Sequence, residues 1–307
     1  MDIGFMVYFL GAEEMREVER EASKTVIDES LRGWSYNSSP VRPPYDIPLP
    51  VSVIANRYCR CGRDVYLSYV LRQAGKPPTE ARTGHLYHEI ISSIVEEAKR
   101  FIYNYGTAPP IELYQYLDTM GETTIQGLAD KLKLPTEDSL HVRNARKLWM
   151  YMSLEISHSL NTVLSRGVGV SLDTLVSATI PFVVNYLVNG RPVGLSERLQ
   201  ADALGAMSLV LDLKTGPPMD FHKLTTTGYA LALESSLSQP VNVGCIVYLS
   251  FRDESPTPIV IRRIHAIDES LRMEFLEERD RKQRIVAEGI DPAKPSICDP
   301  NCMYLNL

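Results

Sequence analysis

Hydrophobic residues recur three and four positions apart through the first half of the chain, which is the spacing of a helix with one buried face. This spacing predicts helices over residues 11–32, 62–73, 80–105, 110–133 and 138–166. Residues 37–50 interrupt the pattern with five prolines and indicate a linker or an extended arm. We therefore expect a helical front with little strand before Gly169.

The pattern changes after residue 171 to apolar runs of strand length. The runs predicted to form strands are residues 174–188, 194–204, 208–214, 241–251 and 258–267. A helix is predicted between the third and fourth runs, at residues 221–236, and a charged helix closes the series at residues 268–288. Strands around one internal helix are typical of a mixed sheet, so the expected fold class is α/β or α+β.

The composition adds limits on the class of protein. The chain has 307 residues, of which 44% are hydrophobic, and this is enough for a proper core. Its net charge of −6 provides no basic excess, so any contact with nucleic acid is expected in a local basic groove. The early apolar run from Ile3 to Leu10 is too short to span a bilayer and lacks a basic leader. We expect no membrane anchor and a cytoplasmic location.

Candidate chemistry begins with "LVLDLKTG", residues 209–216. Side chains alternate along a strand, so Asp212 and Lys214 point to one face. "QADALGAMSLVLDLK" predicts a hairpin joined around Gly205, with Asp202 on the first strand and Asp212 on the second. Two close carboxylates repel unless a divalent cation neutralises them, and Lys214 could then position water or stabilise charge on a phosphate. The alternative is an edge-strand salt bridge, which an Asp-x-Lys triplet commonly forms.

Two further segments add to this candidate site. "RTGHLYHEII", residues 82–91, places Gly84 four residues before His88 at the start of a helix. "HKLTTTGYALALES", residues 222–235, places a polar helix directly after the lysine strand, with Tyr229 one turn beyond Thr225. Taken in order, these motifs and the two acidic strands resemble the RecB-like branch of the PD-(D/E)xK nucleases.

The resemblance implies a restriction-endonuclease-like core, in which a mixed β-sheet is flanked by helices, together with a helical N-terminal region. It also implies that Lys214 orients the attacking water and that Tyr229 closes the site over the substrate or the lysine. One or two Mg²⁺ or Mn²⁺ ions are implied as cofactors. The residues implied to hold them are His88, Asp202, Asp212 and, through its backbone carbonyl, Leu213.

Two positions complicate this assignment. The family commonly has Gln four residues before the helix tyrosine, where this chain has Thr225. His85 competes with His88 for the metal, and we prefer His88 because its spacing from Gly84 fits the motif. Glu89 and Glu197 are interpreted as solvated charges.

The cysteines form a second constellation. Cys245 lies within an apolar strand and is expected to be a small buried hydrophobic residue. The other four are two close pairs at opposite ends of the candidate nuclease unit, namely Cys59 with Cys61 and Cys298 with Cys302. In a cytoplasmic chain, such pairs suggest one metal centre that joins the two ends rather than disulfides. Four thiolates suit Zn²⁺ or an iron–sulfur cluster, and their spacing leaves both open.

RecB-like nucleases with a cysteine before the His motif and more near the C terminus are typically iron–sulfur proteins. Among them this chain resembles the CRISPR-associated RecB-like exonucleases, specifically their longer archaeal subtype, from about Cys59 to Cys302. The resemblance therefore implies an iron–sulfur cluster, 4Fe-4S rather than 2Fe-2S, with Zn as the alternative. The family usually places one cysteine upstream and three downstream, whereas this chain has two and two.

The same resemblance implies a metal-dependent exonuclease that acts on single-stranded DNA ends and trims new spacer DNA before integration. It implies the CRISPR integrase and other adaptation proteins as partners, and it leaves oligomerisation open. One alternative is a repair or recombination nuclease of the AddB type, whose motor would be a separate protein because no G-x-x-x-x-G-K-[ST] motif is present. The other is a cluster-containing scaffold subunit with a vestigial site, which Thr225 favours.

We expect the chain to have four parts. Residues 1–50 form an N-terminal helix and proline-rich arm, and residues 51–170 form a helical region with the first cysteine pair and the His motif. Residues 171–290 form the PD-(D/E)xK nuclease core, and residues 291–307 form a cysteine-bearing tail that packs back on the N-terminal region.

Overall fold

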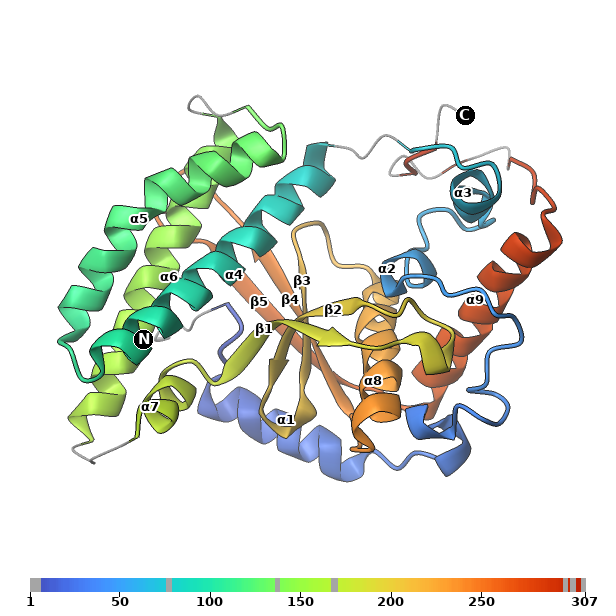
Figure 1. The fold of residues 1–307 in the computed structure, drawn as a ribbon, viewed down its shortest axis with the longest axis horizontal. Helices are drawn as coiled ribbons and strands as arrows, with labels where there is room; N and C mark the ends of the chain where they lie inside the picture. The colour runs from blue at the N-terminus through green and yellow to red at the C-terminus, as the bar shows by residue number, and fades with distance from the viewer. Residues whose placement is uncertain are drawn as a thin grey trace.

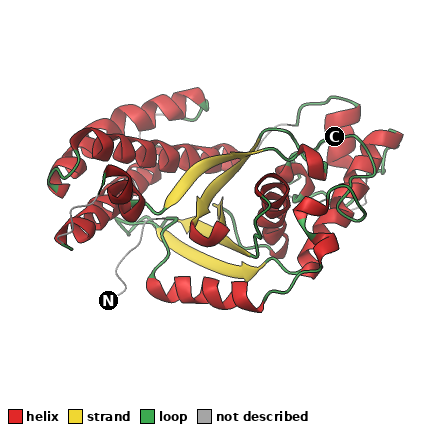
Figure 2. Cartoon of the chain, turned by 60° about the horizontal axis from the view of Figure 1, so that its bottom comes forward, coloured by secondary structure: helices red, strands yellow, loops and turns green. Residues whose placement is uncertain are grey.

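A five-stranded mixed sheet forms the centre of the molecule, and helices pack around it (Figures 1 and 2). The computed structural model describes residues 7–75, 79–135, 139–166, 171–294, 298 and 302–304. The strands lie in the order in which they occur in the chain: β1 (Phe182–Val188), β2 (Leu199–Gly205), β3 (Val210–Lys214), β4 (Val243–Ser250) and β5 (Ile259–Ala266). Neighbouring strands are antiparallel except β3 and β4, which are parallel.

The helices before the sheet confirm the predicted helical front. The α-helices are α1 (Ala12–Lys24), α2 (Val51–Ile54), α3 (Arg63–Val65), α4 (Thr79–Tyr105), α5 (Pro110–Lys131), α6 (Leu140–Ser165), α7 (Leu172–Thr179), α8 (Lys223–Leu237) and α9 (Glu269–Glu288). The predicted helix over residues 62–73 continues from α3 as a π-helical turn, Tyr66–Val70. Within the described residues, no helix is both long and apolar enough to cross a membrane.

The first predicted strand is wrong in its first half. Residues 174–179 belong to α7, whose N-terminus is capped by Ser171, because the Ser171 side chain accepts a hydrogen bond from the backbone N–H of Thr174. Pro181 then precedes β1. A run of apolar residues does not by itself distinguish a buried helix from a strand, and here the cap and the proline decide the boundary.

Each face of the sheet packs against its own hydrophobic core. Leu211 and Leu213 of β3 join α4, α5 and α6 in one core, while Val210 of the same strand joins α2, α8 and α9 in the other. Helix α8 connects β3 to β4 and thereby makes this pair parallel. Asp212 and Lys214 share the parity of Val210, so they belong to the face opposite Leu211 and Leu213.

Helix α9 fixes the proline-rich arm to the rest of the molecule. Its buried side chains donate hydrogen bonds to backbone carbonyls: Arg272 to Leu31, Arg279 to Pro40 and Val41, Gln283 to Ile47, and Lys282 to Val53, Ile54 and Asn56. A Cβ atom on Gly33 would lie 2.0 Å from the carbonyl oxygen of Leu231, so the arm also approaches α8 closely. Residues 37–50 are therefore a packed arm rather than a loose linker.

A buried ion network supports the same junction. Glu234 of α8 is fully buried, and its carboxylate accepts hydrogen bonds from the guanidinium groups of Arg32 and Arg272. The backbone N–H groups of Gly33 and Val241 donate to the same carboxylate. Because every charge in the network is paired and hydrogen-bonded, burial of these groups is tolerated.

Candidate active site

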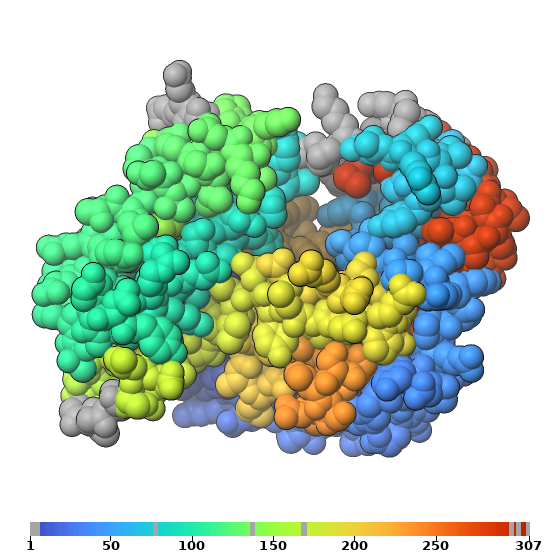
Figure 3. Space-filling model, viewed as in Figure 1, coloured from blue at the N-terminus to red at the C-terminus, as the bar shows by residue number. Residues whose placement is uncertain are grey.

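A cleft of about 570 Å³ lies where α4, the segment 52–58 and the first turns of α8 meet the end of β3. Figure 3 shows it as a hollow between α4 and the segment around residues 50–75. The polar ends of β2 and β3 line this cleft through Asp202, Asp212 and Lys214. The carboxyl end of a parallel strand that leads into a helix is a common position for ligand sites in α/β sheets.

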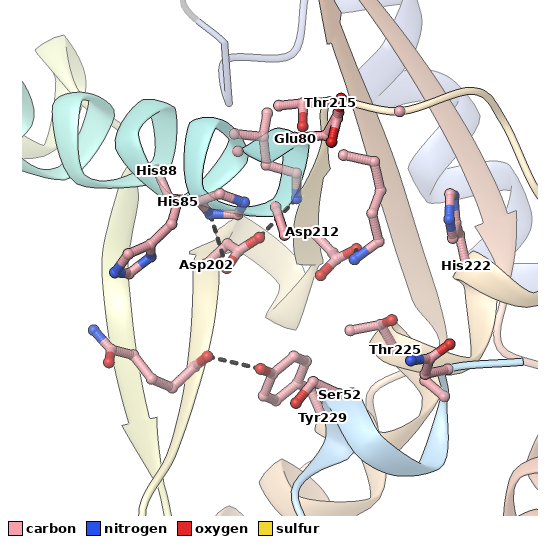
Figure 4. A pocket seen from close by; sticks show the side chains of 18 of the residues that line it. Ser52, Glu80, His85, His88, Asp202, Asp212, Thr215, His222, Thr225 and Tyr229 are labelled. Atoms are coloured by element: carbon pink, nitrogen blue, oxygen red, sulfur yellow. Dashed lines mark hydrogen bonds and ion pairs between the residues drawn. The ribbon is translucent and has the colours of Figure 1, made fainter. Parts of the chain in front are cut away.

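The predicted hairpin brings Asp202 and Asp212 onto neighbouring strands. The pairs Ala203 with Leu211 and Leu204 with Val210 set an antiparallel register between β2 and β3, and one further step along it places Asp202 opposite Asp212. The turn contains Met207 and Ser208, both with positive φ. The two carboxylates point into the same part of the cleft (Figure 4).

Asp202 connects three elements of the site. Its Oδ2 atom accepts a hydrogen bond of 2.7 Å from the backbone N–H of Leu213, and its Oδ1 atom lies 3.3 Å from His88 Nδ1. Burial acts to raise the pKa of Asp202, but the charge and hydrogen bond of His88, the charge of Lys214 and the Leu213 N–H together lower it. Asp202 is therefore an ionised carboxylate at neutral pH.

The Asp212 side chain is more deeply buried than that of Asp202 and has fewer hydrogen-bond partners. Its side chain pairs with Lys214, whose Nζ atom lies 2.7 Å from Asp212 Oδ2. Beyond this ion pair, no described residue donates a hydrogen bond to the buried Oδ2 atom. Burial raises the pKa of Asp212 to about 6, an effect that Lys214 opposes and Asp202 reinforces. The cleft thus holds a buried carboxylate oxygen whose partner among the described residues is the Lys214 ammonium.

Lys214 and His88 supply the positive charge of the site. Burial acts to lower the pKa of Lys214, but Asp212 and Asp202 raise it above its ordinary value. Burial likewise acts to lower the pKa of His88, and Asp202 reverses the direction. Lys214 is therefore an ammonium donor at neutral pH and not a general base.

Gly84 explains how α4 approaches the sheet closely enough to deliver His88. A Cβ atom at this position would lie 2.9 Å from Thr215 Oγ1, directly after Lys214. His88 follows one turn later, on the same side of the helix, and meets Asp202. His85 also lines the cleft, but its side chain is 55% exposed and its Nε2 atom pairs with Glu89 at 3.8 Å. The structure brings His88, and not His85, to the carboxylate pair.

Tyr229 lies below the carboxylates in Figure 4 and joins α8 to β2. Its hydroxyl donates a hydrogen bond of 2.8 Å to the carbonyl oxygen of Gln200. Burial, and then Asp202 and Asp212, raise its pKa, so the hydroxyl stays protonated. Thr225 lies one turn earlier, buried in the wall of the cleft. Its short side chain replaces the glutamine expected from the nuclease resemblance.

Two residues of the cleft were missed by the sequence analysis. Asn185 of β1 lines the cleft with a positive φ of 52°, at the register position opposite Asp202. No sequence signal marks this residue, because its backbone conformation is set by the sheet. His222 is buried beside Tyr248, and burial and then Lys214 lower its pKa to about 4, so it is neutral. Its place directly before α8 was visible in the sequence but carried no motif.

The donor atoms of the site fit a hard divalent cation. Two carboxylates on adjacent strands are the type of ligand that Mg²⁺ and Mn²⁺ take. In the arrangement described, these charges are paired with Lys214 and His88. Among the described parts of the chain, no three His, Cys, Asp or Glu side chains are grouped tightly enough to hold one metal ion.

The first cysteine pair lies at the other end of the segment that borders the cleft. Cys59 Sγ lies 3.5 Å from Cys61 Sγ, and the loop is held to α9 because Arg281 donates a hydrogen bond of 3.1 Å to the carbonyl oxygen of Cys61. Burial raises the pKa of Cys59 to about 12. Cys245 is fully buried in β4, as expected for a small hydrophobic residue.

The second pair belongs to a tail that returns to this loop. The Arg63 side chain donates a hydrogen bond to Asp291, and this bond raises the pKa of Arg63. The thiols of Cys61 and Cys298 also raise the pKa of Arg63. Cys298 therefore lies in the neighbourhood of Arg63, which follows the first pair in the chain. Further on, the Tyr304 hydroxyl lies 2.5 Å from Ser68 Oγ and donates to the carbonyl oxygen of Gln73. The described part of the tail thus packs beside residues 63–75.

Comparison with known proteins gives the family. Residues 6–307 match the family described as CRISPR-associated exonuclease Csa1. Over 280 residues the chain is 32% identical to the CRISPR-associated exonuclease Csa1 of Saccharolobus solfataricus, with 91% of each chain covered. Over 282 residues it is 27% identical to the protein of the same description from Thermoproteus tenax, with 92% of this chain and 91% of that relative covered. The chain therefore belongs to the Csa1 family of CRISPR-associated exonucleases.

Proposed function

We propose that the protein is a divalent-metal-dependent exonuclease that hydrolyses single-stranded DNA ends and trims new spacer DNA before its integration. The observation that carries this proposal is the shared cleft of Asp202, Asp212 and Lys214, in which two carboxylates from adjacent strands lie beside one ammonium group. Membership of the exonuclease family supports the reaction class. The CRISPR integrase and other adaptation proteins are the proposed partners.

The residues of the cleft have distinct tasks in this proposal. His88, Asp202, Asp212 and the backbone carbonyl of Leu213 would hold Mg²⁺ or Mn²⁺, which supplies Lewis-acid activation of the phosphate and of water. Lys214 donates hydrogen bonds, since its raised pKa keeps it charged, and so orients the attacking water and stabilises charge that develops on the phosphate. Tyr229 keeps its proton and borders the substrate side of the cleft.

We also propose that Cys59, Cys61, Cys298 and Cys302 hold one iron–sulfur cluster, 4Fe-4S rather than 2Fe-2S, with Zn²⁺ as the alternative. The close sulfur atoms of the first pair, and the position of Cys298 near Arg63, support a shared centre. The cluster would be structural, because the loop of the first pair is anchored to α9 and lies outside the residues that line the cleft.

Cleavage of a 5′-labelled and a 3′-labelled single-stranded oligonucleotide tests the catalytic proposal. The wild-type chain with Mn²⁺ or Mg²⁺ is expected to shorten the DNA, whereas Asp202→Ala, Asp212→Ala and Lys214→Ala are each expected to abolish shortening at unchanged circular dichroism. Cleavage that survives these substitutions would show that the site is elsewhere. A wild-type chain that is inert on every DNA would favour the scaffold alternative.

A further inference from the structure

A second cavity of about 590 Å³ adjoins the catalytic cleft. Phe221 lines both cavities and therefore forms part of the wall between them. The second cavity is bordered by Arg57 and Arg60, by the loop that leads from β3 to α8, and by α9. A chain molecule that is bound at Asp212 and continues past Phe221 would enter it directly.

The wall between the cavities is aromatic. The rings of Tyr58 and Phe221 meet edge to face, with centroids 5.2 Å apart and planes at 88°. The ring of His222 also meets Phe221 edge to face, with centroids 5.0 Å apart. Bases of single-stranded nucleic acids stack on such rings without strong sequence preference, because every base offers a flat π-face.

The charges of the second cavity divide into paired and unpaired groups. Arg57 pairs with Glu274, and Arg281 pairs with Glu278. Arg60, Lys223 and Asp220 are exposed at the same cavity, and no ion pair joins any of the three to a described residue. Four cationic and three acidic side chains line the cavity, so in a chain with a net charge of −6 it is a locally basic place for phosphate groups beside an aromatic wall.

Lys223 also occupies a position that helix stability does not favour. It is the first residue of α8, and a cation at a helix N-terminus opposes the helix dipole. Its ammonium therefore contributes nothing to α8 by itself, and a carboxylate at this position would stabilise the helix. The 3₁₀ turn Asp220–His222 leads directly into α8, and a phosphate bound here would offset the unfavourable charge of Lys223.

We propose that the second cavity binds the nucleotides that flank the scissile phosphate of single-stranded DNA, with Arg60 and Lys223 on their phosphates and Phe221 against a base. This inference rests on the proposed function, since it extends the path of the same substrate beyond the catalytic cleft. It assigns strand binding to residues that are separate from the metal and lysine site.

Binding measured without cleavage tests the inference. The full chain with Asp212→Asn is titrated with a fluorescein-labelled twelve-residue oligothymidylate, and anisotropy is recorded at several KCl concentrations. Adding Lys223→Glu is expected to raise Kd about ten-fold and to reduce the slope of log Kd against log salt by roughly 0.7 to 1. Phe221→Leu is expected to raise Kd about ten-fold with the slope unchanged. Lys24→Glu, an exposed lysine at the end of α1, is the matched control and should change neither quantity.

The outcomes separate this inference from the proposed function. Lys223→Glu is expected to weaken binding while its melting temperature stays equal or rises, which excludes unfolding as the cause. If the wild-type chain cuts DNA but Lys223→Glu and Arg60→Gln bind as Lys24→Glu does, the second cavity is not on the strand path and only the inference is wrong. If the wild-type chain neither cuts nor binds DNA, the proposed function and the inference are both overturned.

Discussion

Asp212 is predicted to destabilise the metal-free fold, so that Asp212→Asn stabilises it while removing activity. Burial raises the pKa of this carboxyl group from its ordinary 3.8 to about 6. A carboxyl group with a raised folded-state pKa favours folding while it is protonated at low pH. That contribution is lost as the pH rises from about 3.8 through about 6. The difference between these two pKa values corresponds to about 3 kcal/mol of folding free energy, at about 1.36 kcal/mol per pKa unit. This figure is an upper limit, because the titration of Asp212 is coupled to the charges of Asp202, Lys214 and His88.

Thermal unfolding of the metal-free protein in chelator checks this magnitude. At pH 7.5 the Asp212→Asn chain should melt a few degrees above the wild-type chain, since about 1 kcal/mol shifts the melting temperature of a large domain by roughly 2 °C. At pH 5, between the unfolded-state and the folded-state pKa, the difference in melting temperature should be about half as large. Excess Mn²⁺ should then raise the melting temperature of the wild-type chain alone. A variant that is less stable than the wild-type chain by the same amount at both pH values would refute the reasoning.

Three further outcomes follow from the geometry. His88→Gln should lower metal-dependent cleavage at least about 100-fold, whereas His85→Gln should retain most of it, and equal losses would contradict the assignment of the ligand. Glu234→Ala should lower the free energy of unfolding by about 3–5 kcal/mol, because it leaves two buried guanidinium groups unpaired. Denaturant titration measures this loss, and a loss below about 1 kcal/mol would contradict the prediction. Cys59→Ser should remove the visible absorbance of anaerobically purified protein and Cys245→Ser should keep it, while zinc without iron would leave a metal centre but exclude the cluster.

The hairpin of the candidate site was predictable because its signals are local. Alternation along residues 208–214 fixes the face of Asp212 and Lys214, and Gly205 marks the bend that returns Asp202 to the neighbouring strand. The spacing of His88 from Gly84 was likewise readable, because both residues lie on one helix and the glycine permits close approach to Thr215. The mixed α/β fold class was confirmed, because the spacing of hydrophobic residues within each segment is a local signal of helix or strand.

The parts that escaped prediction depend on contacts between distant segments. Arg272 of α9 reaches the carbonyl oxygen of Leu31, 241 positions away, and no periodicity in either segment reports this contact. Asn185 takes its positive φ within a strand whose pattern looks regular. The boundary between α7 and β1 was missed because the apolar run 174–188 suits both structures, and the cap at Ser171 and Pro181 together separate them.

The most direct test of the metal-dependent nuclease site is the metal requirement of the purified wild-type chain on single-stranded DNA. After treatment with chelator, cleavage should be absent; it should return with Mn²⁺ or Mg²⁺ but not with Ca²⁺, which takes larger and looser ligand shells. The Lys214→Met chain should remain inactive with every ion, since it lacks the ammonium that lies 2.7 Å from Asp212. Undiminished cleavage in excess chelator, or full activity of Lys214→Met with Mn²⁺, would contradict the assignment of this cleft as the catalytic site.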